Sequence, residues 1–180
     1  MNKYRLLTAE DIECRVSMIK QNGLSLLLYK TARTDANLLD ETVGEDNWQN
    51  DFKLVDGVLY GGIGVNYAKD GPAGNFVWKW DAGVESNTEA EKGRASDAFK
   101  RAGFKHGIGR ELYTAPFIWI PADRCTIQER EYKGQKKYVC NDSFSVEKIA
   151  YNDRQEISGL AVRNDKTGKR VFVWQSQPPA

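Results

Sequence analysis

The fold of this chain depends first on one helical stretch, which reads Glu91-Lys92-Gly93-Arg94-Ala95-Ser96-Asp97-Ala98-Phe99-Lys100-Arg101-Ala102-Gly103-Phe104-Lys105-His106-Gly107-Ile108-Gly109-Arg110. Ser86 and Thr88 each precede a glutamate by three residues, which is capping-box spacing. A long helix is therefore expected from Thr88 to His106 or Gly107. Small and apolar residues at helical spacing predict its buried face, namely Ala95, Ala98, Phe99 and Ala102. Their small size should let the helix lie close against a sheet.

The same stretch concentrates positive charge. Between Lys92 and Arg110 there are six lysines and arginines and one aspartate, a local net charge of +5, whereas the whole chain has a formal net charge of +1. At about 100° per residue, Arg94, Arg101 and Lys105 share one flank of the helix, and Lys100 lies on the other. An Asp97–Arg101 pair at i, i+4 would give part of this charge a purely structural role. One carboxylate cannot neutralise six cations, so the stretch predicts a site for a polyanion.

Alternating segments before this helix predict a three-stranded antiparallel meander. Strands are expected at 48–54, 58–67 and 76–80, with turns at Asp56-Gly57 and Lys69-Asp70-Gly71-Pro72. Gly61-Gly62-Ile63-Gly64 in the middle strand indicates a bulge, a bend or a close backbone approach. The segment is rich in aromatic residues, which are Trp48, Tyr60, Tyr67, Phe76, Trp78 and Trp80. They either fill the core or, where exposed, stack a nucleic-acid base.

Two helices are predicted before the meander, and hairpins after the basic helix. Ile12, Val16 and Ile19 have helical spacing between an N-cap at Thr8 and a stop at Asn22-Gly23. A second helix has the apolar stripe Ala32, Ala36, Leu39 and Val43, and it ends at Gly44. Later strands are expected at 117–120, 126–132, 136–140, 144–151, 157–162 and 171–174. The expected fold class is α+β: an antiparallel three-strand meander packed on a long basic helix (a β-β-β-α core), preceded by helices and followed by additional β-hairpins.

The 180 residues, 41% of them hydrophobic, are enough for one domain with a substantial core. We expect a core at 1–120, a β-rich extension of the same domain at 121–174 and a flexible tail at 175–180. No apolar segment approaches the roughly 20 residues that span a bilayer, and the N-terminus lacks the apolar part of a signal peptide. A cytoplasmic protein without membrane contact is therefore expected. Three cysteines without C-x-x-C spacing favour buried thiols over disulfides or a zinc site.

Catalytic motifs are missing from the sequence. His106 is the only histidine, which excludes catalysis by a histidine pair and a two-histidine metal site. Thr167-Gly168-Lys169-Arg170 lacks the first glycine and the final hydroxyl of a phosphate-binding loop. A metal-dependent nuclease remains a weak alternative, based on Asp81, Glu85, Glu89 and Glu91. We therefore expect no enzyme, no catalytic residues, no metal and no cofactor.

A second charged stretch is acidic. Between Asp35 and Asp56 there are seven carboxylates and one lysine, a net charge of −6. This stretch is either a solvated face or the surface that meets the basic face of a neighbouring subunit.

Two motifs, together with the order of the elements, resemble a known family. The motifs are Leu38-Leu39-Asp40-Glu41-Thr42-Val43-Gly44-x-x-Asn47-Trp48 and Ala95-Ser96-Asp97-Ala98-Phe99-Lys100-Arg101-Ala102 followed by Gly107. Over residues 25–120 the chain resembles the Rad-fifty-two-type single-strand annealing proteins, in particular the compact forms of bacteriophages and prophages. The stretch from Pro121 onward lies outside the resemblance.

The resemblance implies ATP-independent binding of single-stranded DNA and annealing of complementary strands in recombination and repair. It also implies a homo-oligomer, as a ring, an open arc or a filament, in the cytoplasm of a bacterial host. A host or phage single-strand binding protein is a further candidate partner. The alternative function is a single-stranded DNA or RNA binding protein that does not anneal, or a recombinase loader.

The predicted site combines the basic run with the resemblance. In the family, a Lys-Arg pair of the long helix lines the DNA groove, and it corresponds to Lys100 and Arg101. A family cation on the preceding helix falls on Thr34, with Arg33 beside it. Another family cation, one turn after the pair, falls on Phe104, and Lys105 can substitute for it. The predicted DNA-binding residues are Lys100, Arg101, Arg94, Lys105, Arg33, Lys92 and Arg110.

Overall fold

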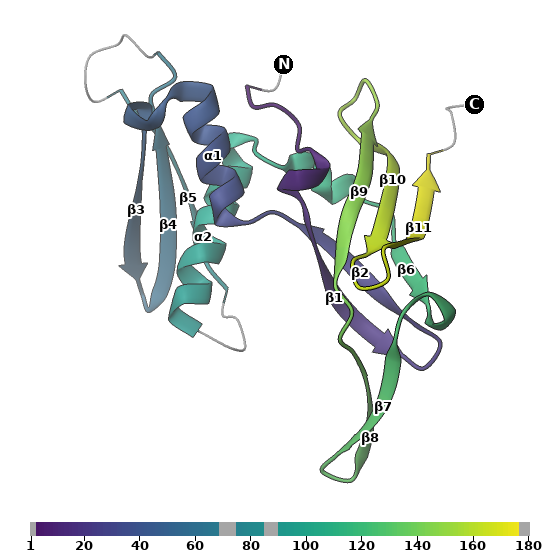
Figure 1. Cartoon of the computed structure of the whole chain (residues 1–180). Helices are drawn as coiled ribbons and strands as arrows, with labels where there is room; N and C mark the ends of the chain where they lie inside the picture. The colour runs from purple at the N-terminus through teal and green to yellow at the C-terminus, as the bar shows by residue number, and fades with distance from the viewer. Residues whose placement is uncertain (1–2, 69–74, 85–89, 177–180) are drawn as a thin grey trace. The chain divides into compact units, whose positions relative to one another are not determined.

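The computed structural model describes residues 3–68, 75–84 and 90–176, without the side chains of 90–92. These residues form eleven β-strands and two α-helices (Figure 1). The chain divides into two compact units. The first unit is Met1–Leu6 with Lys30–Arg110, and the second is Leu7–Tyr29 with Glu111–Ala180. Each unit has its own sheet and its own core.

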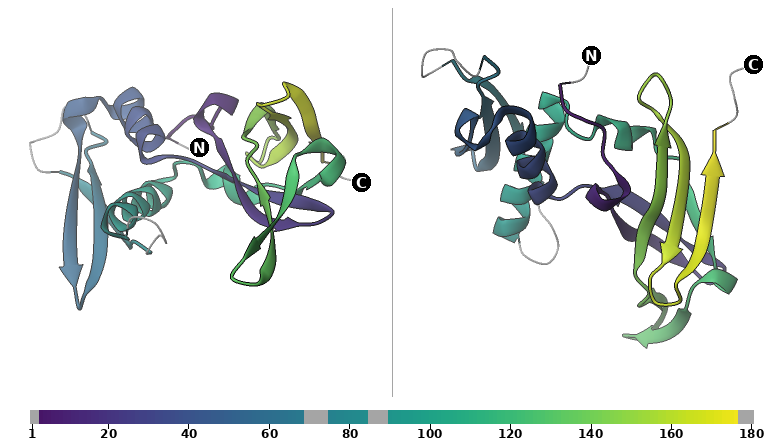
Figure 2. Two further views of the ribbon diagram at one scale, coloured as in Figure 1. Left: turned by 60° about the horizontal axis from the view of Figure 1, so that its bottom comes forward. Right: turned by 45° about the horizontal axis from the view of Figure 1, so that its top comes forward.

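The first unit contains both α-helices and a three-stranded antiparallel sheet. The sheet has the order β3 (Trp48–Val55), β4 (Val58–Val65) and β5 (Val77–Ala82). α1 (Ala32–Val43) begins after its N-cap Thr31, and α2 (Ala90–His106) packs on β4 and β5 (Figures 1 and 2). The buried residues between them include Leu38, Leu39, Ile63, Val65, Ala98, Phe99 and Ala102. The three strands predicted before the basic helix are thus present and paired as a meander.

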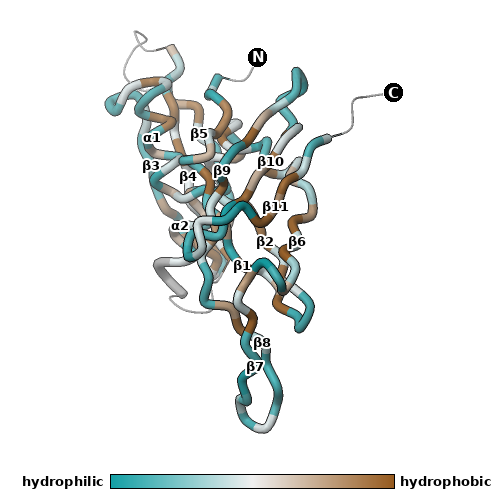
Figure 3. Tube along the Cα trace, turned by 45° about the vertical axis from the view of Figure 1, so that its right-hand side comes forward, coloured by the Kyte–Doolittle hydropathy of each residue, from teal (hydrophilic) through white to brown (hydrophobic). Residues whose placement is uncertain are grey.

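The second unit is built mainly of strands. Its main sheet contains β1 (Glu13–Lys20), β2 (Gly23–Tyr29), β6 (Ile118–Pro121), β9 (Phe144–Tyr151), β10 (Ile157–Asn164) and β11 (Lys169–Gln175). The strand order is β11-β10-β9-β1-β2-β6, and β11 returns beside β6, so the sheet nearly closes on itself. β7 (Ile127–Tyr132) and β8 (Gln135–Cys140) form a separate, largely hydrophilic hairpin (Figure 3). Short 3₁₀ turns occur at Ala9–Asp11, Glu45–Asn47, Arg110–Thr114 and Ala122–Arg124.

The predicted fold class is wrong for the chain. Strands dominate, the nearly closed six-stranded sheet was not foreseen, and of the two helices predicted before the meander only α1 is present among the described residues. The segment with Ile12, Val16 and Ile19 forms β1, which pairs with β2 across the Asn22-Gly23 turn. The less exposed side chains of β1 are every second residue as far as Val16. A bulge between Val16 and Met18 adds one residue, so the next less exposed side chain is that of Ile19. Alternation plus one extra residue thus imitates helical spacing. Thr8 does cap a helix, but only the short turn Ala9–Asp11.

The remaining predicted elements match the structure more closely. α1 ends before Gly44, α2 ends at His106, and the six strands expected after Pro116 are all present with small changes at their ends. The capping residues Ser86 and Thr88, the turn at 69–72 and the last four residues of the tail lie outside the described residues. None of the described helices has the length and apolar character needed to cross a membrane.

Candidate nucleic-acid interface

Close packing of α2 on the sheet sets the position of its cations. A Cβ placed on Gly61 would lie 2.8 Å from the Ala98 Cβ, and a Cβ on Gly83 would lie 2.1 Å from the Arg94 carbonyl oxygen. No side chain fits at either position without moving the helix. The glycine cluster of β4 therefore marks a close backbone approach, which was one of the three predicted possibilities.

Lys100 lies beside the first turn of α1. Its carbonyl oxygen accepts a hydrogen bond of 3.1 Å from Lys30 Nζ. Its side chain is half-buried, and among the described residues its ammonium group has no hydrogen bond or ion pair. Arg33 is exposed on that first turn of α1 and likewise has no partner within the described part of the chain. Within the described residues, therefore, no hydrogen bond or ion pair holds either cation, although Lys100 is close enough to Asp35 to interact with its carboxylate electrostatically.

Arg101 and Lys105 lie along the outer edge of β5. Arg101 Nε donates to the Ala82 carbonyl at 3.2 Å, and Lys105 Nζ donates to the Trp80 carbonyl at 2.6 Å. Each also has a carboxylate nearby, Asp97 at 3.7 Å from Arg101 Nε and Asp81 at 3.5 Å from Lys105 Nζ. Both side chains remain more than 40% exposed. The predicted Asp97–Arg101 ion pair is therefore present. Arg101 and Lys105 also donate hydrogen bonds to carbonyl groups of the edge strand β5.

Arg110 closes the C-terminal end of α2. Its guanidinium donates to the carbonyls of Phe104 and Lys105 at 2.9 and 2.8 Å and lies 5.5 Å from the centre of the Phe104 ring. Binding the last carbonyls of a helix is a capping role. Arg94 is half-buried, and the side chain of Lys92 lies outside the described residues.

Among the predicted cations whose side chains are described, there is therefore no single continuous group. Lys100 and Arg33 gather near the start of α1, whereas Arg101 and Lys105 follow the β5 edge. The helical projection correctly separated Lys100 from Arg101 and Lys105. It could not show that Arg110 serves as a cap.

Lys30 and Asp35 form a buried ion pair next to the backbone of Lys100, and the sequence analysis did not predict it. Lys30 Nζ lies 2.6 Å from Asp35 Oδ2, with side-chain exposures of 7% and 0%. Burial raises the pKa of the Asp35 carboxyl, while the ammonium groups of Lys30 and Lys100 oppose that shift. The pair joins the start of α1 to the middle of α2, so it positions both Arg33 and Lys100.

His106 is buried and has a structural role. Its Nε2 lies 2.8 Å from the Ile63 carbonyl oxygen, so Nε2 carries the proton and donates it. Its Nδ1 then accepts from the Tyr67 hydroxyl at 2.8 Å. Burial lowers the pKa of His106, and the nearby cations Lys79, Arg110 and Lys3 lower it further. The imidazole is therefore neutral, and it ties α2 to β4.

We expect the neutral state of His106 to make the first unit less stable in mild acid. An unfolded chain protonates histidine near its usual pKa of about 6.5, whereas the folded state resists protonation. The contribution of His106 to the free energy of unfolding is thus fully present above that pH, and it is lost as the pH drops through it toward the lowered folded-state pKa. Urea unfolding at a series of pH values measures this, and the difference between wild type and His106→Gln isolates the histidine. Parallel profiles for the two proteins would contradict it.

Three members of the acidic stretch have partners inside the first unit. Asp35 pairs with Lys30, Asp40 accepts from Trp48 Nε1 at 2.6 Å, and Glu41 binds Arg5 at 2.8 Å. The other four carboxylates, Glu45, Asp46, Asp51 and Asp56, are exposed. The stretch is therefore not one uniform acidic face.

The sheet face opposite α2 carries Trp78 and Trp80. For both residues the sequence left open whether the ring fills the core or lies at the surface. A Cβ on Gly62 would meet three ring atoms of Trp80 at 2.5 to 2.6 Å, and a Cβ on Gly64 would meet those of Trp78 at 2.6 to 2.9 Å. The centroids of the two indole rings are 5.3 Å apart, and their planes are 19° apart. Lys53 Nζ lies 4.1 Å from the centre of the Trp80 ring. Side chains at 61 and 62 point to opposite faces because successive strand residues alternate, so this cluster faces away from α2.

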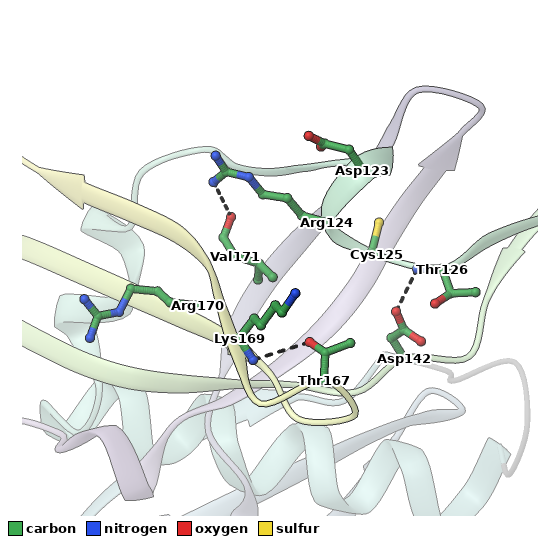
Figure 4. A pocket seen from close by; sticks show the side chains of 9 residues that line it. All are labelled: Asp123, Arg124, Cys125, Thr126, Asp142, Thr167, Lys169, Arg170 and Val171. Carbon is green, nitrogen blue, oxygen red and sulfur yellow. Dashed lines mark hydrogen bonds between the residues drawn. The ribbon is translucent and has the colours of Figure 1, made fainter.

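The second unit has a hollow of its own, of about 490 Å³ (Figure 4). Its cations are largely engaged: Arg124 donates to the Val171 carbonyl at 3.1 Å, and Arg170 turns away from the hollow to pair with Glu147 at 2.6 Å. Asp142 accepts from Thr126 N, Asn164 and Lys166. Although burial acts in the opposite direction, these hydrogen bonds lower the pKa of the Asp142 carboxyl. The hollow mixes both signs of charge and favours no ligand class.

Within the described part of the chain, no three His, Cys, Asp or Glu side chains gather to hold a metal ion. Of the carboxylates considered for a nuclease, Asp81 lies beside Lys105, Glu85 and Glu89 lie outside the described residues, and the side chain of Glu91 is not described. Comparison with protein-family models, with curated proteins and with solved structures finds no match to this chain.

Proposed function

We propose that this chain binds single-stranded DNA through the cations of α2 and α1 and anneals complementary strands without a nucleotide cofactor. The observation that carries the proposal is that, among the described side chains, Lys100, Arg101 and Lys105 of α2 are only partly offset by carboxylates, and Arg101 and Lys105 stay more than 40% exposed. Asp97 and Asp81 offset Arg101 and Lys105 in part, and no carboxylate forms an ion pair with Lys100 among the described residues. A DNA backbone relieves this repulsion and releases its own counterions.

Phosphate contacts of this kind suit annealing. Lysine and arginine hold phosphates without reading sequence, so the base edges of the bound strand stay free to pair. The same cations lower the repulsion between two strands that approach each other. No covalent step takes part, which agrees with a sequence that contains no catalytic motif.

Assembly and location belong to the proposal. One protomer presents only a few cations, so a strand of many nucleotides requires several copies side by side, as in a ring, an arc or a filament. A cytoplasmic location in a bacterial host goes with the proposed role in recombination. A single-strand binding protein of host or phage remains a candidate partner.

An annealing reaction tests the proposed function. Two complementary dye-labelled strands are mixed with the purified chain in EDTA and without nucleotide, and pairing is followed by energy transfer. We expect pairing to be faster than without protein. Binding without faster pairing would favour a non-annealing binder, which competition between single-stranded DNA and RNA would then characterise. Loss of labelled DNA on addition of Mg²⁺ would favour a nuclease.

A further inference from the structure

We infer that the sheet face opposite α2 is a stacking surface for the bases of single-stranded DNA, formed by Trp78 and Trp80 and bordered by Lys53 and Tyr60. This inference rests on the proposed function and adds a second kind of contact to it. Phosphates are held by cations, and bases are held by flat aromatic rings. The face on which these rings lie is distinct from the one that α2 covers.

The geometry shows that the indole rings lie flat on the sheet. Three ring atoms of Trp80 are almost equally distant from the Cβ position of Gly62, and Trp78 has a similar relation to Gly64. Each ring therefore has one face against a glycine of β4 and the other turned away from the strand. Only glycine leaves room for this arrangement, because a Cβ at 62 or 64 would lie within 3 Å of the ring.

Lys53 shows that the outer face of Trp80 can be reached. Its ammonium lies 4.1 Å from the ring centre, and the inner face of the ring is already covered by Gly62. Lys53, Val55, Tyr60 and Trp80 together line an open and mostly apolar hollow of about 280 Å³. That volume is close to the lower end of the roughly 300 to 1,000 Å³ typical of small-molecule sites. A base that stacks on Trp80 would replace the ammonium of Lys53, which could then approach a phosphate.

Charge next to the aromatic rings favours nucleic acid as the occupant. The carbonyl of Trp80 accepts from Lys105, and the carbonyl of Ala82, two residues along β5, accepts from Arg101. Phosphate-binding groups thus follow the edge of the same strand whose side chains form the stacking surface. Asp51 is exposed and lies level with Gly62 and Trp80 in the strand register. Among the described residues of β3, β4 and β5, it is the carboxylate on this face that would repel DNA.

Tryptophan emission and binding to an oligothymidylate test the inference. We expect the strand to quench wild-type emission, and Trp80→Leu to weaken its binding about tenfold, since each stacked base contributes about 1–3 kcal/mol. The slope of log affinity against log salt should not change, because no cation is lost. An abasic strand of the same length should bind both proteins equally. Asp51→Asn should tighten binding, and it changes no residue of the stacking surface.

Trp119→Leu is the matched control. Trp119 is also half-buried, stacks with a neighbouring ring, Phe117, and lies over a glycine, Gly23, but it belongs to the second unit. We expect its loss to leave binding unchanged. Full binding by Trp80→Leu, or unquenched emission while wild type still binds, would overturn the stacking surface and leave the proposed function intact. If the wild type binds no DNA at all, the proposed function itself fails. Should Trp80→Leu not fold, the wild-type emission and Asp51→Asn decide the matter.

Discussion

Replacing Lys30 by methionine is expected to lower the free energy of unfolding by about 3–5 kcal/mol, a large part of the roughly 5–15 kcal/mol that stabilises a typical protein. The cause is Asp35, whose side chain has no exposure to solvent and would lose its cation. The buried carboxylate must then take up a proton or expose itself. Urea unfolding followed by circular dichroism measures the change.

Two further variants make this prediction specific. Lys30→Met with Asp35→Leu should recover most of the loss, because an apolar pair often replaces a buried ion pair without destabilisation. Arg5→Met is the matched control, since Arg5 and Glu41 form an ion pair that is 40% and 50% exposed. It should cost less than about 1 kcal/mol. Equal losses for Lys30→Met and Arg5→Met would contradict the structural role of the buried pair.

The second large effect concerns DNA binding. Lys100→Ala with Arg101→Ala should weaken binding to single-stranded DNA by at least about tenfold, because two charge-assisted contacts are lost. The slope of log affinity against log salt should become shallower by about 1.4, since each phosphate contact on a single strand contributes about 0.7. Fluorescence anisotropy at several salt concentrations measures both quantities.

The control for this variant has the same loss of charge in the second unit. Lys136 and Lys137 are adjacent, exposed and part of the hydrophilic hairpin β7–β8. Lys136→Ala with Lys137→Ala should leave the salt slope within error of wild type. Lys100→Arg keeps a cation near both Asp35 and the DNA, so it should retain binding. An unchanged salt slope in the Lys100 and Arg101 double variant would remove these residues from the interface.

The meander could be predicted because its signals are local. Turn residues and alternating apolar positions mark β3, β4 and β5, and the small residues of α2 mark its buried side. The first predicted helix failed for an equally local reason. A single bulge after Val16 shifts the alternation and copies the spacing of a helix. The six-stranded sheet could not be foreseen, because it joins residues 13–29 to strands more than 85 residues further along the chain.

The site was only partly predictable. The run of cations in α2 is visible in the sequence. Which of them donate hydrogen bonds to the carbonyls of the helix end or of the edge strand β5 depends on the fold, because only the fold brings those carbonyls near. Lys30 and Asp35 gave no signal, because a lysine before a helix is common and its burial depends on packing. The proposed stacking surface did leave a signal in the sequence. Trp78-x-Trp80 pairs with Gly62-x-Gly64 across the strands, so each large ring faces a missing side chain.

The annealing rate of wild type beside the two double variants, measured in EDTA and without nucleotide, decides whether the cations of α2 act in annealing. We expect wild type and Lys136→Ala with Lys137→Ala to accelerate pairing equally. Lys100→Ala with Arg101→Ala should pair strands no faster than they pair alone, while its circular dichroism spectrum is unchanged. Full annealing by that last variant, or no acceleration by wild type, would contradict the proposed function of this helix.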